Sequence, residues 1–262
     1  MSTLPVNADR LGRLCLVPTP LDFGCDEQAP LDQVLPAETL RVAASLTHWI
    51  TENAKSTRAF LKRVQASTPL AASLQDMAIQ ELPRQVHKKG DHEAGSGPDM
   101  RPLLAAALQG HDIGLVSEAG MPAIADPGSS VVRAAHALGI EVVPLVGPVS
   151  LMLALAASGL NGQSFAFVGY LPQEASERSQ RIRELEALAH KTGQTQLFIE
   201  TPYRNAALLQ GLLQVLKPPT RLALCCGMTL AQQAVHSAAA SDWKKRAPTL
   251  PLALPAIFMI GR

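Results

Sequence analysis

The feature that most constrains the fold is an alternation of short apolar runs and helical segments in the middle of the chain. Residues 113–117 form an apolar run typical of a β-strand, and residues 129–138 have helical spacing and are followed by Gly139. The pattern then repeats, with a strand expected at 141–145 and a helix at 149–158. Short apolar strands that alternate with helices are typical of parallel sheets covered on both faces. The sequence therefore predicts an α/β fold with a mainly parallel sheet.

Further elements are expected on both sides of this alternation. Before it, the spacing predicts strands at 14–17 and 48–51 and helices at 39–46, 56–64 and 100–109. After it, residues 169–173 read as a turn or linker, followed by helices at 174–190 and 205–216 and strands at 196–200, 221–226 and 256–260. Pro248, Pro251 and Pro255 argue against a long helix in the ambiguous stretch 233–255. A boundary near Gly147 predicts two α/β domains, 1–146 and 147–262.

Composition narrows the class of protein. Hydrophobic residues make up 47% of the 262 residues, so a sizeable core can be buried, and the net charge of +1 gives no overall signature of nucleic-acid binding. Cys225 and Cys226 stand together in an apolar run and are expected to be buried thiols, and no metal site is predicted from the four cysteines. The first ten residues do not resemble a signal sequence, and every long apolar run is interrupted, which predicts a soluble, cytoplasmic protein.

Two loops follow expected strands and precede expected helices, where open α/β sheets bind ligands. The first covers residues 117–128, in which Gly120 and Gly128 allow sharp turns; it reads equally well as a ligand loop or as an ordinary connection with Asp126 near the helix start. In the second, Gly147 and Pro148 precede Ser150, which suits a helix cap better than a ligand contact.

A third segment, 84–98, is rich in glycine and basic residues. It reads as a solvated loop, with a phosphate-contacting arm as the alternative. A zinc site formed by His87, Asp91 and His92 is an alternative that the spacing does not favour, because no fourth ligand stands at a suggestive distance along the chain.

Five segments, in this order, resemble those of the tetrapyrrole methylases, and more narrowly those of the bacterial rRNA 2′-O-methyltransferases built on that fold. They are Val17-Pro18-Thr19-Pro20, S-E-A-G-M-P-A-I-A-D-P-G at 117–128, V-V-P-L-V-G-P-V-S-L at 142–151, F-V-G-Y-L-P at 167–172 and L-F-I-E-T-P-Y-R at 197–204. The resemblance runs, with gaps, from about residue 14 to residue 261, and the order of the segments is its most specific feature.

The resemblance implies two α/β domains with S-adenosylmethionine in a cleft between them, and a homodimer. Carried over by position, the implied cofactor-binding residues are Pro20, Glu118, Ala119, Gly120, Met121, Ile124, Ala125, Ser150, Leu151, Glu200, Thr201, Gly227, Met228, Pro255 and Ala256. Backbone groups are expected to make much of this contact. The implied partner is small-subunit rRNA or the ribosomal subunit, with no membrane and no metal.

The sequence departs from the rRNA branch at three places. Pro20-Leu21-Asp22-Phe23-Gly24 stands where P-I-G-N is usual, Glu52-Asn53-Ala54-Lys55 where E-D-T-R is usual, and Glu118 and Met121 alter the usual S-D-A-G-T-P. Lysine lacks the bidentate fork of arginine. Glu52, Lys55 and Glu118 are the candidate catalytic residues, against the alternative of ordinary surface charges.

Three functions follow as hypotheses. The first is methylation of a ribose 2′-hydroxyl in small-subunit rRNA, which predicts a basic surface from residues such as Arg58, Lys62, Arg63, Lys88 and Lys89. The second is methylation of a tetrapyrrole or another small molecule, which predicts a deep apolar trough. The third is a protein that binds S-adenosylmethionine without catalysis.

Overall fold

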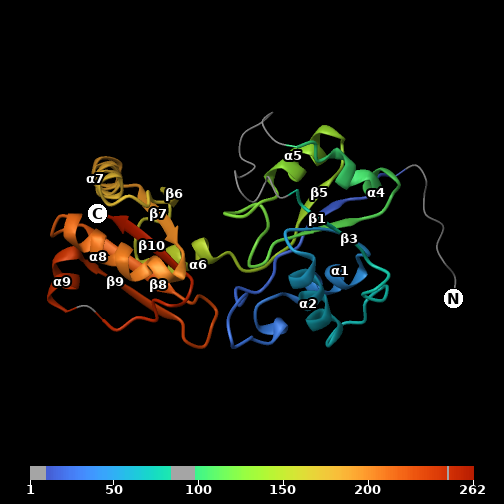
Figure 1. The fold of residues 1–262 in the computed structure, drawn as a ribbon, viewed down its shortest axis with the longest axis horizontal. Helices are drawn as coiled ribbons and strands as arrows, with labels where there is room; N and C mark the ends of the chain where they lie inside the picture. The colour runs from blue at the N-terminus through green and yellow to red at the C-terminus, as the bar shows by residue number, and fades with distance from the viewer. Residues whose placement is uncertain (1–9, 84–97, 247) are drawn as a thin grey trace. The chain divides into compact units, whose positions relative to one another are not determined.

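The computed structural model describes residues 10–83, 98–246 and 248–262. Within these residues the chain forms two compact units (Figure 1). The first holds residues 10–23, 29–83 and 98–148, and the second holds residues 24–28, 149–246 and 248–262. The arrangement of the two units relative to one another is not defined, so each is described by itself.

The first unit is built on a five-stranded parallel sheet with the strand order β3-β2-β4-β1-β5. The strands are β1 (Leu14–Leu16), β2 (His48–Thr51), β3 (Ala78–Glu81), β4 (Ile113–Val116) and β5 (Val142–Pro144). Its helices are α1 (Ala37–Ser45), α2 (Ala54–Gln65), α4 (Ala105–Leu108) and α5 (Ser129–Ala137), with short 3-10 helices η1 (Leu31–Gln33) and η2 (Arg101–Leu104).

Helices cover both faces of this sheet, as the sequence predicts. Successive residues of a strand point to opposite faces. Accordingly Cys15 and Trp49 pack with the buried side chains of α1 and α2, whereas Leu14 and Ile50 pack with those of α4 and α5 (Figure 1). Both faces are thereby removed from water, which accounts for the continuous apolar character of the central strands.

The second unit contains a mixed sheet with the order β6-β7-β10-β8-β9. Its strands are β6 (Phe165–Tyr170), β7 (Thr195–Glu200), β8 (Arg221–Cys226), β9 (Ala234–Ala239) and β10 (Ala256–Gly261). Only β6 and β7 pair in parallel, so the predicted parallel character holds for the first unit and is wrong for this one. Strands β9 and β10 both run antiparallel to β8, and β10 also runs antiparallel to β7.

Helices also lie on both faces of the second sheet. They are α6 (Ser150–Ser158), α7 (Ala175–Thr192), α8 (Asn205–Val215) and α9 (Ala240–Lys245), with the 3-10 helix η3 (Pro202–Arg204). Side chains of α7, α8 and α9 share one core with Phe198, Phe258 and Trp243. On the other face α6 packs against β8, where the Cys225 thiol lies 3.7 Å from the carbonyl oxygen of Ala154.

Several local predictions are corrected. Residues 169 and 170 end strand β6 instead of forming a turn, because β6 tolerates a register shift near the left-handed Gly169. The helix expected at 100–109 is divided into η2 and α4, with Pro102 in the first turn. The prediction of buried thiols is confirmed, since Cys225 and Cys226 are both inaccessible and unpaired. Across the described ranges, no helix has both the length and the apolar character to cross a membrane.

Candidate functional site

The loop after β4 lies at the carboxyl edge of the first sheet, and it is joined to the loop after β1. Thr19 and Gly120 pair as an isolated antiparallel bridge, with N–H to O distances of 3.0 and 3.1 Å. The Thr19 hydroxyl also donates to the carbonyl oxygen of Ser117 at 3.3 Å. Because Gly120 has φ 77°, this bridge requires a backbone conformation that glycine adopts without strain. The structure therefore brings Pro20 beside the predicted residues of the 118–125 segment.

Backbone strain is concentrated in two of the predicted cofactor segments. Among the described residues, the non-glycine residues with left-handed backbone are Ala123 (φ 66°), Ala125 (φ 63°) and Thr229 (φ 70°). Such conformations cost roughly 1–3 kcal/mol each and cluster at ligand-binding positions. Ala123 and Ala125 lie in the 117–128 loop, and Thr229 follows Gly227 and Met228. The strain thus marks two loops to which the family resemblance assigns cofactor contacts.

Asn53 connects α2 to the 117–128 loop. Its side-chain oxygen caps α2 by accepting from the backbone N–H groups of Lys55 and Ser56. Its side-chain amide donates to Glu118 Oε1 at 3.0 Å. Two departures from the usual motifs, Asn53 and Glu118, are therefore hydrogen-bonded to each other. An aspartate at position 53 would lack this donor.

Three carboxyl groups gather at this edge. Glu52 Oε2 lies 3.5 Å from the backbone nitrogen of Glu118. Burial, followed by the charges of Glu52 and Glu118, raises the pKa of Asp126 to about 7. Asp126 is not the cap of α5, because Gly128 occupies that position without a side-chain cap. The sequence prediction named Glu52 and Glu118 but missed Asp126; its place in the same loop was the available signal.

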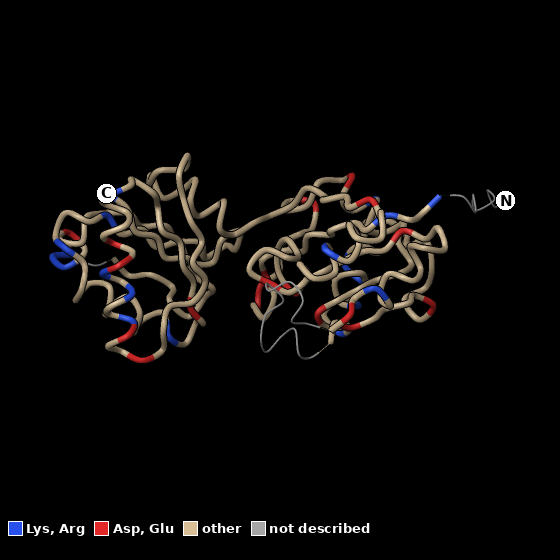
Figure 2. The backbone as a smooth tube through the Cα atoms, turned by 90° about the horizontal axis from the view of Figure 1, so that it is seen from above, with Lys and Arg blue, Asp and Glu red and all other residues tan. Residues whose placement is uncertain are grey.

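The basic residues predicted for the first unit that the structure describes are either exposed or paired with another side chain. The Lys55 side chain is exposed and makes no ion pair with a described residue. Arg63 does not contribute to a basic surface: it binds buried Asp22 through two nitrogens at 3.0 and 2.9 Å and donates to the Ala29 carbonyl. Arg58 and Lys62 are exposed, and charges of both signs occur along each unit (Figure 2). Lys88 and Lys89 lie outside the described residues.

In the second unit, strand ends bring three of the predicted segments together. Ala256, the first residue of β10, is the register partner of both Glu200 in β7 and Cys226 in β8. Gly227 donates to the Pro255 carbonyl at 2.8 Å, which ties the turn after β8 to the start of β10. The backbones of Glu200, Gly227 and Pro255 therefore lie at one edge of the sheet.

The structure defines what the side chains of Glu200 and Ser150, two predicted residues of the second unit, contact. The Glu200 carboxylate turns back on its own chain, where Oε1 accepts from Thr201 N at 2.7 Å and from Arg204 Nη2 at 2.8 Å. Its side chain is thus occupied, and the backbone is what remains for a ligand. Ser150 does not cap α6, because Val149 holds the cap position and no side chain bonds there. The cap interpretation of Ser150 is wrong, and Leu151 beside it is buried.

Metal ligation has no geometric support in the described residues, where no three histidine, cysteine, aspartate or glutamate side chains are grouped to hold an ion. The segment 84–97, with His87, Asp91 and His92, lies outside those residues. Its interpretation as a solvated loop or a phosphate-contacting arm stays a prediction.

Comparison with known proteins defines the class. Residues 42–242 match the family described as Tetrapyrrole (Corrin/Porphyrin) Methylases. This match spans more than half of the chain, and the chain belongs to that family. Solved structures agree at the level of the fold. The methyltransferase CobJ has a TM-score of 0.54 and 16% identity, with 96% of this chain and 94% of that chain covered. For uroporphyrin-III-C-methyltransferase from Thermus thermophilus the values are 0.50 and 20%, with 95% and 92% covered.

Curated relatives point to a particular branch. A protein of Pseudomonas aeruginosa named ribosomal RNA small subunit methyltransferase I is 29% identical over 235 residues, covering 88% of this chain and 73% of the relative. The protein of the same name from Vibrio cholerae is 38% identical over 125 residues, covering 48% of this chain and 42% of the relative. The similarity to the second protein therefore spans less than half of that relative's length.

Proposed function

We propose that this protein is an S-adenosylmethionine-dependent methyltransferase that methylates a ribose 2′-hydroxyl of small-subunit ribosomal RNA. The observation that carries the proposal is the similarity to the Pseudomonas aeruginosa relative, which extends over 88% of the chain. The strained loop after β4 supports it, because the family resemblance gives this loop to the cofactor and its left-handed alanines leave the backbone accessible.

The residues at the two sheet edges suit this cofactor. In the proposal, the first unit contributes the backbone of Pro20, Glu118, Ala119, Gly120, Met121, Ile124 and Ala125. The second contributes Ser150, Leu151, Glu200, Thr201, Gly227, Met228, Pro255 and Ala256. Small side chains at Ala119, Gly120 and Ala125 allow a ligand to approach the main chain. Glu52, Glu118 and Asp126 place three carboxyl groups at the first edge.

When bound, the cofactor supplies a methyl group on a positively charged sulfur. The protein's own residues position the acceptor, exclude water and accept the hydroxyl proton. Asp126 suits the last role better than Glu52 or Lys55, because burial raises its pKa to about 7, the range in which a general base works best. Glu118 is held by the hydrogen bond from Asn53 and then acts as a positioning residue. Its charge contributes to the raised pKa of Asp126.

The family resemblance also supports a proposal about the oligomeric state and the cellular location of the protein. The protein would work as a homodimer, as the family resemblance implies, and in the cytoplasm, where ribosomal subunits are assembled. Its partner would be small-subunit rRNA or the subunit itself, which the names of the relatives support.

Calorimetric titration with S-adenosylmethionine tests the cofactor proposal. We expect saturable binding at one site per chain and at least about tenfold weaker binding for Gly120→Ala. The added Cβ would require a left-handed alanine and would lie 3.1 Å from Leu21 Cδ2.

The matched control is Gly139→Ala, since Gly139 also has a left-handed backbone (φ 70°), yet no atom lies within 4 Å of the added Cβ. Unchanged affinity in the Gly120 variant, or equal losses in both variants, would contradict the assignment of this loop. Binding without transfer to RNA or to a tetrapyrrole would favour a non-catalytic protein.

A further inference from the structure

A polar hollow lies at the amino edge of the first sheet, opposite the edge that carries the 117–128 loop. It has a volume of about 450 Å³, within the usual range for ligand sites. Its walls are the segments that lead into β1, β2 and β4, and they contribute Arg10, Arg13, Thr47, His111 and Asp112. None of the family motifs includes these residues.

Close backbone packing forms one side of the hollow. Gly12 lies so near the chain at His111 that an added Cβ would be 2.0 Å from the His111 carbonyl oxygen. Its N–H donates to the Ala107 carbonyl at 2.8 Å. Any side chain at this position would separate the two segments, so the glycine keeps Arg13 and Asp112 in register.

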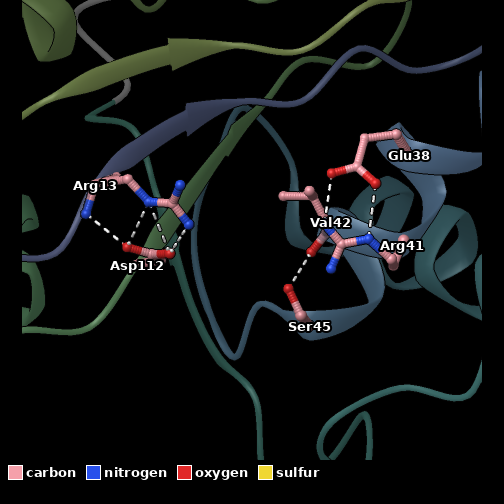
Figure 3. Close-up of polar contacts among 6 residues, drawn as sticks. All are labelled: Arg13, Glu38, Arg41, Val42, Ser45 and Asp112. Atoms are coloured by element: carbon pink, nitrogen blue, oxygen red, sulfur yellow. Dashed lines mark hydrogen bonds and ion pairs between the residues drawn. The ribbon is translucent and has the colours of Figure 1, made fainter. Parts of the chain in front are cut away.

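Arg13 is held by Asp112 in a fixed orientation (Figure 3). Asp112 accepts from the backbone N–H of Arg13 at 2.7 Å, from Nε at 3.1 Å and from Nη2 at 2.6 Å. Arg13 Nη1 has no hydrogen-bond partner within the described part of the chain. The side chain is 38% exposed, so this nitrogen is available to an anion from solvent. A guanidinium fixed in this way loses little freedom when it binds.

The remaining groups of the hollow include a second arginine and two histidines. Arg10 is exposed. Burial acts to raise the pKa of Asp112, but the hydrogen bonds and charge of Arg13, with a smaller effect of the Arg10 charge, lower it below its ordinary value. His111 stacks on His48 with ring centroids 4.8 Å apart, and His48 Nδ1 is 3.0 Å from the Thr47 hydroxyl. Arg10 and Arg13 thus face two carboxylates, that of Asp112, which Arg13 binds, and that of Glu141, whose charge also acts on Arg13. His111 adds ring nitrogens to this set of donors. This donor set matches a phosphate group.

We propose that this hollow binds a phosphate group of the RNA backbone, so that the proposed acceptor contacts the first unit at both edges of its sheet. The inference rests on the proposed function for the source of the phosphate. The contact carries no base specificity, because phosphate contacts position a nucleic acid without reading its sequence.

The test compares the wild type with Arg10→Ser/Arg13→Gln, and with the single variant Arg10→Ser in case the double variant is unstable. Binding of a labelled short single-stranded RNA is measured by fluorescence anisotropy over a range of salt concentrations. We expect affinity to fall roughly tenfold in the double variant and the slope of log K against log salt to decrease by about one. Binding of S-adenosylmethionine should be unchanged. Arg183→Ser, which removes an exposed arginine from α7, is the matched control.

The inference is overturned if the double variant binds the RNA with the same affinity and the same salt slope as the wild type. A second measurement separates its failure from that of the proposed function. If the wild type does not bind the RNA at all, the proposed function fails. Titration with inorganic phosphate then tests whether the hollow binds a phosphate group. A saturable shift of the His111 ring signals in NMR spectra, absent in the double variant, supports the phosphate site; no shift overturns it.

Discussion

At the scale of single residues, two departures from the motifs of the rRNA branch are matched by partners elsewhere in the chain. Asn53 donates to Glu118, so both replacements contribute to one hydrogen bond. Asp22, which stands in the segment that is usually P-I-G-N, is buried and paired with Arg63. The sequence shows each replacement but not its partner, because the pairs are 65 and 41 residues apart. These two contacts explain how the loops that contain Asp22, Asn53 and Glu118 keep their shape although these residues differ from the usual motifs.

The half-buried carboxyl of Asp126 gives a prediction about pH. The unfolded chain releases this proton near the ordinary value of 3.8, whereas the folded protein holds it to about pH 7. The folded state therefore binds more protons between these values, and stability falls as the pH rises through this window. Asp126→Asn removes this titrating group and should stabilise the protein by about 2 kcal/mol above pH 7. This is roughly half of the free energy that corresponds to the full pKa difference, because solvent screens a partly exposed carboxyl.

Urea unfolding at about pH 5 and about pH 8 measures this difference. The gain should be smaller at the lower pH, where the wild-type carboxyl is still protonated. Asp32→Asn, at an exposed carboxylate, is the control and should change stability little at either pH. Equal effects of the two substitutions at about pH 8 would show that Asp126 is not perturbed. The same variant should lose the rise in methyl-transfer rate expected as Asp126 deprotonates.

At the scale of elements, the strands that the sequence predicts are chiefly those inside the sheets. Strands β2, β4, β7, β8 and β10 have continuous apolar runs because neighbours and helices cover them. The missed strands β3, β6 and β9 are edge strands, which pair on one side only and retain exposed residues. A weak apolar pattern at an edge is the physical reason for missing β3 and β9. It does not explain β6, which begins with the apolar run 165–168. The mixed direction of the second sheet could not be predicted from strand positions alone.

The start of α2 offers a prediction at this scale. Asn53→Ala removes the cap and the bond to Glu118, and should cost about 1–2 kcal/mol. Asn53→Asp keeps the cap acceptor but places a second carboxylate beside Glu118. We expect Asn53→Asp/Glu118→Gln to recover the stability that Asn53→Asp loses, because the new amide can donate to the new carboxylate.

A double-mutant cycle at these two positions measures the coupling, which should be about 1 kcal/mol. Additive effects would mean that the Asn53–Glu118 hydrogen bond contributes nothing to stability. Methyl-transfer assays of the same variants show whether Glu118 also positions the acceptor.

At the scale of the whole molecule, each unit has its own core. The first unit has separate clusters on the two faces of its sheet, and the second is centred on Phe198, Phe258 and Trp243. The only two tryptophans, Trp49 and Trp243, are both buried, one in each unit. The motif order predicts the family and the loops of the site, but a hollow at the amino edge has no sequence signal because its residues come from three separate segments.

These tryptophans allow the two cores to be tested separately. An added Cβ at Gly12 would lie 2.0 Å from the carbonyl oxygen of His111, so Gly12→Ala should destabilise the first unit by about 1–3 kcal/mol. In a Trp243→Phe background the fluorescence midpoint of Trp49 should fall, whereas in a Trp49→Phe background that of Trp243 should stay unchanged. Gly162→Ala is the control, since open space surrounds its added Cβ. A common shift of both midpoints would show that the units unfold together.

The measurement that tests the central claim most directly is methyl transfer to small ribosomal subunits that lack the modification. The purified protein is incubated with S-adenosylmethionine carrying a labelled methyl group, and the rRNA is digested and analysed by mass spectrometry. The account predicts label in one 2′-O-methylated nucleoside, and a much lower rate for Asp126→Asn. Cofactor binding with label absent from RNA, or label transferred to a tetrapyrrole instead, would contradict it.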